Sequence, residues 1–134
     1  MAIIAWFNEV SKSDIPLVGG KGANLGEMTQ AGIRVPGGYN ITIEGYDAFV
    51  EANQLHDKVM DVIKDLNVDD TAALQKASRE IRDLMEIQPI PKDLEKLITE
   101  AYDKAIGDFP DAFVAVRSSA TAEDLPDASF AGQQ

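Results

Sequence analysis

The chain has 134 residues, none of them cysteine, with 45% hydrophobic residues, 26% charged residues and a formal net charge of −11 at pH 7. This length predicts a single domain over residues 1–134, and the acidic balance argues against nucleic-acid binding, which needs a basic face to neutralise phosphates. The lack of cysteine excludes disulfides, thiol catalysis and Cys-based zinc sites. The chain also has no run of about 18 apolar residues, so we expect a cytoplasmic protein with no membrane span.

The N-terminal region contains two short apolar runs and a glycine-rich stretch. Residues 3–7 predict a short strand, and residues 15–18 predict a second extended run because Pro16 disfavours a helical conformation of the residue before it. A short helix is then expected to start near Gly20 and to end at Gly32, which is a good C-terminal stop. Residues 35–42 follow as a turn and a strand.

The middle of the chain, residues 43–107, shows helical periodicity throughout. Thr42 can cap its first helix, either Asp69 or Asp70 can cap a later amphipathic one, and Gly107 marks the end of the last. A Pro-containing turn then leads into residues 113–116, which are typical of a buried strand. We therefore expect an α+β fold in which short strands at both ends of the chain enclose about four or five helices.

The first polar stretch that merits attention is Val18-Gly19-Gly20-Lys21-Gly22-Ala23-Asn24-Leu25-Gly26. Glycines before a helix let backbone N–H groups approach an anion closely, and a lysine there adds a full charge. The spacing fits neither the P-loop nor the dinucleotide-binding pattern. From these residues alone, a phosphate site and a plain glycine turn with an exposed lysine have similar weight.

The second polar stretch is the run that starts at Arg117 and continues through Ser118, Ser119 and Thr121. An arginine and several hydroxyls at a strand end suit phosphate or carboxylate, because the guanidinium presents a rigid fork of donors. The alternative is an ion pair of Arg117 with a nearby carboxylate and hydroxyls that only cap a turn. Two such stretches in one acidic chain favour an anion site. We expect no metal ligands among the carboxylates that follow, and a surface position for His56.

These two stretches together resemble the phosphoenolpyruvate synthase and pyruvate, phosphate dikinase family. The resemblance rests on residues 18–28, on the Val-Pro-Gly-Gly of residues 35–38, and most strongly on Phe113-Val114-Ala115-Val116-Arg117-Ser118-Ser119-Ala120-Thr121-Ala122-Glu123-Asp124 and its continuation to Gln134. It implies the N-terminal portion of a truncated ATP-binding domain related to the ATP-grasp fold, and the segment from Pro126 looks closer to the synthases.

Carried over position by position, the resemblance implies that Lys21 contacts the ATP phosphates and that Arg117 reaches them near the group being transferred, as a catalytic residue. It also implies that residues 129–134 begin a glycine-rich loop over the triphosphate, with Gly132 at the closest backbone approach. Lysine, arginine and backbone N–H groups together stabilise charge on a transferred phosphoryl group. The Mg²⁺ ligands of the family lie downstream of Gln134.

The resemblance further implies a parent enzyme that converts ATP, water and pyruvate into phosphoenolpyruvate, AMP and phosphate through a phosphohistidine. The histidine and pyruvate sites lie on domains that this chain lacks, so we expect the chain alone to be inactive. Two alternatives stay open, namely the same domain of a rifampicin phosphotransferase and a stand-alone, non-catalytic nucleotide-binding or interaction module. An exposed sheet edge beyond the last strand makes a homodimer conceivable.

Overall fold

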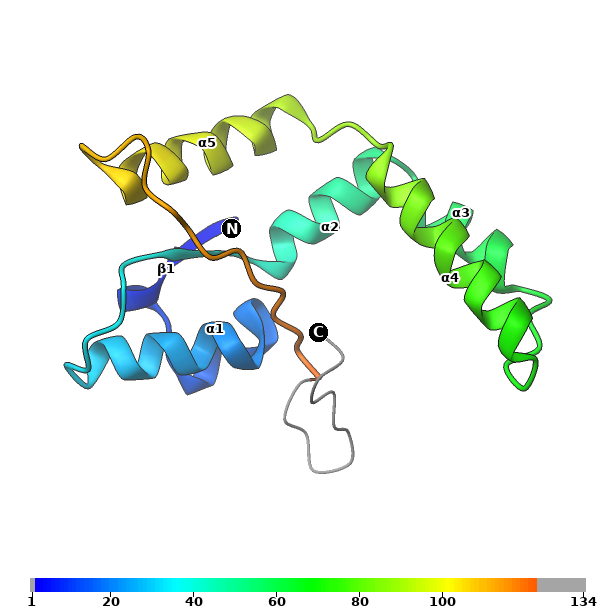
Figure 1. The fold of residues 1–134 in the computed structure, drawn as a ribbon, viewed down its shortest axis with the longest axis horizontal. Helices are drawn as coiled ribbons and strands as arrows, with labels where there is room; N and C mark the ends of the chain where they lie inside the picture. Colours follow the sequence, from blue (N-terminus) through cyan, green and yellow to red (C-terminus); the bar gives the residue numbers. More distant parts are fainter. Residues whose placement is uncertain (1, 123–134) are drawn as a thin grey trace.

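The computed structural model describes residues 2–122, which form a two-stranded sheet, two short 3₁₀ turns and five α-helices (Figure 1). In chain order these elements are β1 (Ile4–Trp6), η1 (Phe7–Glu9), η2 (Lys12–Asp14), α1 (Ile15–Gln30), β2 (Tyr39–Ile41), α2 (Ile43–Ala52), α3 (Leu55–Ile63), α4 (Thr71–Glu86) and α5 (Lys92–Ile106). In Figure 1, α1 and α5 lie on opposite sides of the sheet, and the α3–α4 hairpin extends away from them.

The sheet pairs β1 with β2 in antiparallel register, with Ala5 opposite Asn40 and Trp6 opposite Tyr39. The Asn40 Nδ2 atom adds a side-chain hydrogen bond to the Ala5 carbonyl at 3.2 Å. The Trp6 and Tyr39 rings pack with their centroids 5.4 Å apart, and the Lys104 ammonium of α5 lies 4.8 Å from the Trp6 ring centre. Cross-strand aromatic pairs of this kind stabilise a short sheet that few backbone hydrogen bonds hold.

Tyr39 also ties the sheet to α5. Its hydroxyl donates a hydrogen bond of 3.3 Å to the Ile98 carbonyl. Burial raises the pKa of Tyr39 above its ordinary value, and the nearby Tyr102 raises it further, so the phenol stays neutral and able to donate.

The start of α1 differs from the predicted extended run at residues 15–18. Ile15 has helical dihedral angles (φ −48°, ψ −44°), and Pro16 stands in the first turn of the helix. That position suits proline, because its missing N–H would have no partner inside the helix. The turn is held by burial of Val18, which packs with Ala5, Val10 and Ala23 in the core of this end of the molecule.

The helical block was predicted correctly in its extent and mostly in its caps. Asp70 accepts a hydrogen bond of 3.1 Å from the Ala73 N–H, as an N-cap should, and Gly107 follows α5 with a positive φ of 55°. Thr42 stands at the N-cap of α2, but its side chain does not cap the helix. Its buried hydroxyl donates instead to the Ala2 carbonyl at 2.7 Å.

The expected strand at residues 113–116 is absent: these residues are neither helix nor strand. Within residues 2–122 both strands therefore belong to the first 41 residues, and the predicted strand at residues 113–116 was wrong. Phe113 and Val116 are almost fully exposed (106% and 93%). A strand requires a neighbouring strand for its backbone hydrogen bonds, and none within residues 2–122 lies beside this segment.

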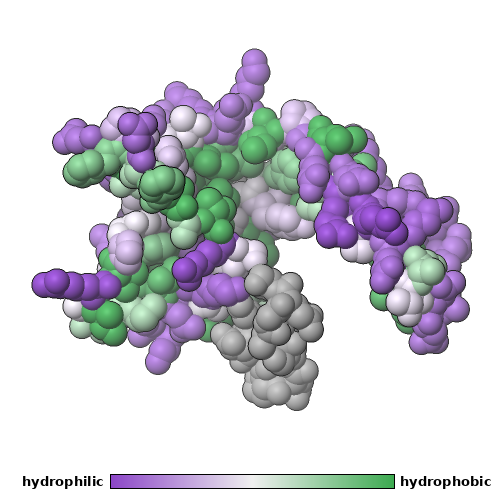
Figure 2. Space-filling model, in the orientation of Figure 1, coloured by the Kyte–Doolittle hydropathy of each residue, from purple (hydrophilic) through white to green (hydrophobic). Residues whose placement is uncertain are grey.

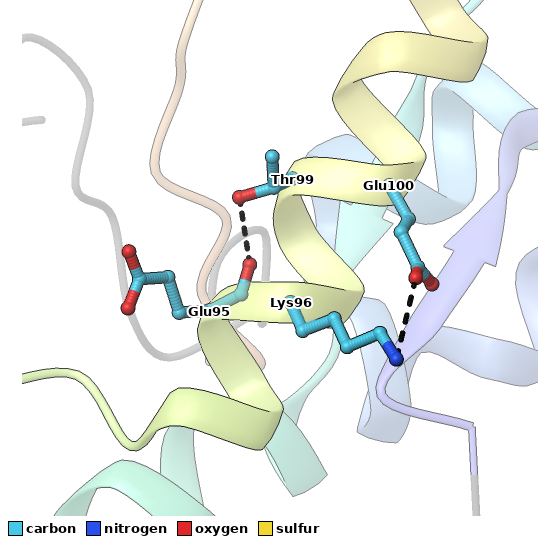
Figure 3. Close-up of polar contacts among 4 residues, drawn as sticks. All are labelled: Glu95, Lys96, Thr99 and Glu100. Carbon is cyan, nitrogen blue, oxygen red and sulfur yellow. Dashed lines mark hydrogen bonds and ion pairs between the residues drawn. The ribbon is translucent and has the colours of Figure 1, made fainter.

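Charged residues cover the outer faces of the helices. On α5, Lys96 and Glu100 form an ion pair at 3.8 Å and Thr99 donates to the Glu95 carbonyl at 2.8 Å (Figure 3). Hydrophobic residues gather between α5, α2 and α1, whereas hydrophilic residues dominate the visible face of α4 (Figure 2). Within residues 2–122 no helix has both the length and the apolar character needed to cross a membrane.

Gly26 allows α1 to pack closely against the chain segment at Val10, which precedes the helix. A Cβ atom there would meet the Val10 carbonyl oxygen, and would lie 2.7 Å from the Val10 Cγ2. We expect Gly26→Ala to lower the free energy of unfolding by about 1–2 kcal/mol, because overpacking of about 1–3 kcal/mol exceeds the gain of up to about 1 kcal/mol in helix propensity. Urea unfolding measures this difference.

The matched control is Gly37→Ala, because no atom lies within 4 Å of the added methyl group and Gly37 has no positive φ. This variant should stay within about 0.5 kcal/mol of the parent chain. Equal stability of the two variants would contradict the close approach of Gly26 to Val10.

Candidate functional site

The two polar stretches singled out in the sequence lie against each other, although about a hundred residues separate them. The Ser119 hydroxyl donates to the Val18 carbonyl at 2.7 Å and accepts from the Gly22 N–H at 3.1 Å. The backbone adds a third bond, from the Gly20 N–H to the Ala120 carbonyl at 3.1 Å. Residues 119–120 are therefore docked on the first turns of α1.

A break in α1 creates this docking place. Gly19 has φ 72° and ψ 174°, a conformation that interrupts the helix and that is essentially restricted to glycine. A Cβ atom on Gly19 would meet the Ser119 hydroxyl and would lie 2.8 Å from the Ser119 carbonyl carbon and 2.9 Å from the Ala120 nitrogen. Glycine is thus required here by both its backbone conformation and the closeness of the docked segment.

The next glycine, Gly22, meets the sheet in the same way. A Cβ atom there would approach the Asn40 side chain, whose amide already donates to Ala5. The glycine turn consequently packs against both β2 and residues 119–120. This position explains why the sequence has small residues on either side of Lys21.

The backbone amides of the turn donate to the protein itself. The Gly20 and Gly22 N–H groups are bonded to Ala120 and Ser119, so they do not present the open row of donors that a phosphate loop offers. Any anion at this site would rely on the side chains of Lys21 and Arg117 for its charge. Lys21 is half-buried and Arg117 is exposed.

An open groove of about 800 Å³ runs beside the docked segment. Its walls come from the start of α1, from α2, from the end of α4 with the residues after it, and from α5, and residues 117–121 form its polar side. Arg117 lines this groove, whereas Lys21 does not. The apolar wall includes Ile43, Tyr46 and Phe49 of α2.

The predicted site residues are thus placed as follows. Lys21 and Arg117 lie on two segments that hydrogen bonds join, while Gly132 and the loop of residues 129–134 lie outside the described residues. Among residues 2–122 no group of three histidine or carboxylate side chains could hold a metal ion. His56 is exposed on α3, as expected.

Two residues have a larger part than the sequence indicated. The sequence predicts Ser119 only as a cap or an anion ligand, and Gly19 only as one of several turn glycines. The adjacent pair Gly19-Gly20 inside an otherwise helical segment is the signal that could have located the break. Nothing in the sequence, however, pairs that break with a serine 97 residues beyond Gly22.

Comparison with known proteins gives a consistent assignment. Residues 15–134 match the family described as the pyruvate phosphate dikinase AMP/ATP-binding domain. The chain is 50% identical to a probable phosphoenolpyruvate synthase of Methanothermobacter thermautotrophicus over 134 residues, covering 98% of this chain and 19% of that protein.

Two further relatives carry similar names. A probable phosphoenolpyruvate synthase of Methanocaldococcus jannaschii is 49% identical over 137 residues, covering 100% of this chain and 11% of the relative. The phosphoenolpyruvate synthase of Pyrococcus furiosus is 43% identical over 165 residues, covering 98% of this chain and 20% of the relative. The chain therefore spans a fifth or less of the length of these curated relatives.

The docking of residues 119–120 can be tested at Gly19. We expect Gly19→Ala to lower the free energy of unfolding by about 2–4 kcal/mol, the sum of a strained backbone conformation and of overpacking against Ser119. Gly32→Ala is the control, because Gly32 also has a positive φ but has no atom within 4 Å of the added methyl group. A loss at Gly32 as large as that at Gly19 would contradict the contact with Ser119.

Proposed function

Because the chain belongs to the pyruvate phosphate dikinase AMP/ATP-binding domain family, we propose that residues 1–134 are the N-terminal portion of an ATP-binding domain and bind the ATP phosphates through Lys21 and Arg117. The observation that carries the proposal is the set of hydrogen bonds between residues 119–120 and the turn that contains Lys21. Arg117 precedes the docked serine by only two residues, so its backbone is tethered near that turn.

The charges of the chain support the same reading. A net charge of −11 repels a nucleotide triphosphate on average, so a phosphate site requires cations that act locally. Arginine can bind two phosphate oxygens at once, and lysine adds a compact charge. We propose that Gly132 completes the site through its backbone, and that Mg²⁺ accompanies ATP with ligands from outside residues 2–122, since the described residues contain no suitable cluster.

For the whole protein we propose the activity that gives the relatives their name. A phosphoenolpyruvate synthase would transfer a phosphoryl group from ATP to an enzyme histidine and then to pyruvate, with Arg117 stabilising the charge on the group in transfer. The names of the relatives favour this activity over that of a rifampicin phosphotransferase. We expect the 134-residue chain alone to be inactive, because its one histidine, His56, resembles no catalytic motif. We further propose a cytoplasmic location, where ATP is available.

A homodimer of the 134-residue chain is a further proposal. Residues 113–116, which belong to neither a helix nor a strand, expose Phe113 and Val116 almost completely. An extended apolar segment with unpaired backbone groups can pair with a second copy of itself.

ATP binding can be measured by titration calorimetry of the 134-residue chain with Mg-ATP. We expect Lys21→Ala and Arg117→Ala each to weaken binding about 10- to 100-fold, because a hydrogen bond to a charged group contributes about 1.5–3 kcal/mol. Lys58→Ala on α3 and Arg79→Ala on α4 are matched controls, since both residues are exposed outside the proposed site and their loss should leave the affinity unchanged.

Equal affinities of all five proteins would contradict a phosphate site at Lys21 and Arg117. Absence of binding by the parent chain would favour the stand-alone interaction module over a nucleotide-binding domain. Weaker binding at higher salt is also expected, because both proposed contacts are ionic.

Self-association can be tested by sedimentation equilibrium over a range of protein concentrations. We expect the parent chain to dimerise and Val116→Lys to shift it to monomer, because a charge on an exposed edge opposes strand pairing. Val68→Lys is the control, since Val68 is also exposed (69%) but follows α3 in a separate part of the fold. A monomeric parent chain, or equal effects of both substitutions, would refute the dimer.

A further inference from the structure

We propose that Ser119 is a positioning residue, which holds the break in α1 open with its hydroxyl and thereby fixes Arg117 relative to Lys21. The inference rests on the proposed binding of ATP by these two cationic residues, and it adds a residue that acts through them. Nothing in the proposal requires Ser119 to touch the nucleotide.

The hydrogen bonds of Ser119 reach two backbone groups that an uninterrupted helix would pair with each other. In an uninterrupted α-helix the N–H of residue 22 would donate to the carbonyl of residue 18, four positions earlier. In α1 the Ser119 hydroxyl bonds to both groups: it accepts from the Gly22 N–H at 3.1 Å and donates to the Val18 carbonyl at 2.7 Å. The side chain therefore stands as an insert in the helical ladder, at the place where Gly19 breaks it.

Only a side chain that both donates and accepts can fill this position. A hydroxyl has one donor and two acceptor lone pairs, so one oxygen satisfies both backbone groups. Val18 and Gly22 are buried and both hydrogen bonds are partly buried, so removal of the hydroxyl takes a protein partner from the Val18 carbonyl and from the Gly22 N–H. Threonine retains the hydroxyl, whereas alanine does not.

The same oxygen limits how far the two cationic residues can move apart. Lys21 is the chain neighbour of Gly22, and Arg117 lies two residues before Ser119. Because a fully extended chain spans about 3.3–3.6 Å per residue, the Arg117 backbone stays within about 7 Å of the serine. The bond from Gly20 to Ala120 is a second tether, one residue farther along the chain from Arg117.

The experiment combines a double-mutant cycle with conservative rescue in the 134-residue chain. Mg-ATP affinity is measured for the parent chain, for Ser119→Ala and for Ser119→Thr. Each of these three proteins is also measured with the added substitution Arg117→Ala. Ser78→Ala on α4 is the control for the loss of a serine elsewhere. We expect Ser119→Ala to weaken binding about tenfold, Ser119→Thr to restore it to within about twofold, and Ser78→Ala to have no effect. In the Ser119→Ala background Arg117→Ala should reduce the Mg-ATP affinity by a smaller factor than in the parent chain, because that arginine is no longer held in place.

A second measurement does not depend on nucleotide. Without ATP, the Gly22 amide of the parent chain should exchange slowly with solvent, and Ser119→Ala should accelerate this exchange at least about tenfold. Cleavage by trypsin after Arg117 should accelerate in the same variant, since an untethered segment enters the protease more easily. Ser119→Thr should reverse both effects.

The outcomes separate this inference from the proposed function. If the parent chain binds ATP, an unchanged Arg117→Ala loss in the Ser119→Ala background overturns the positioning role while ATP binding stands. If the parent chain does not bind ATP, the proposed function fails. The amide exchange of Gly22 and the rate of tryptic cleavage after Arg117 still decide whether Ser119 holds residues 117–120 in place. Fast Gly22 exchange in the parent chain overturns the inference even if Ser119→Ala fails to fold.

Discussion

The arrangement of the candidate site depends on one hydroxyl group between two segments that are distant in the sequence. Ser119 joins the broken first turns of α1 to the C-terminal segment through hydrogen bonds to Val18 and Gly22. Gly19 makes room for this contact, because any side chain there would collide with the docked backbone. The break in the helix and the docked serine are therefore two parts of one feature.

The small sheet and the core residues next to it also pack against the glycine turn of α1 that carries Lys21. Val10 and Val18 pack with Ala5 of β1, and Gly26 lies directly against the Val10 backbone. Asn40 of β2 lies close to Gly22, to which Ser119 also bonds, while its side-chain amide donates to Ala5 of β1. Because interiors are packed to crystal-like density, these close approaches leave the turn that carries Lys21 little freedom.

This arrangement changes the part assigned to the glycines. In a phosphate loop, glycine-rich backbone offers its N–H groups to the ligand. Here the Gly20 and Gly22 amides bond to the protein, so the glycines serve close packing between segments. In the site that we propose, the positive charge for a phosphate would therefore come from the side chains of Lys21 and Arg117, on the two segments that these hydrogen bonds join.

The sequence by itself determined the local features: the helical block of residues 43–107, an aspartate cap at Asp69 or Asp70, the glycine stop at Gly107 and the two cation-bearing stretches. These follow from side-chain periodicity and backbone preference over a few residues, which act in any tertiary context. The long motifs of residues 18–28 and 113–134 predict the ATP-binding domain, and the family match over residues 15–134 confirms it. The tertiary structure alone decided that residues 15–18 turn into α1 and that residues 113–116 remain outside any strand. It also decided that Ser119 enters the break at Gly19, because strand pairing and the completion of a helical hydrogen bond depend on which distant segment is adjacent.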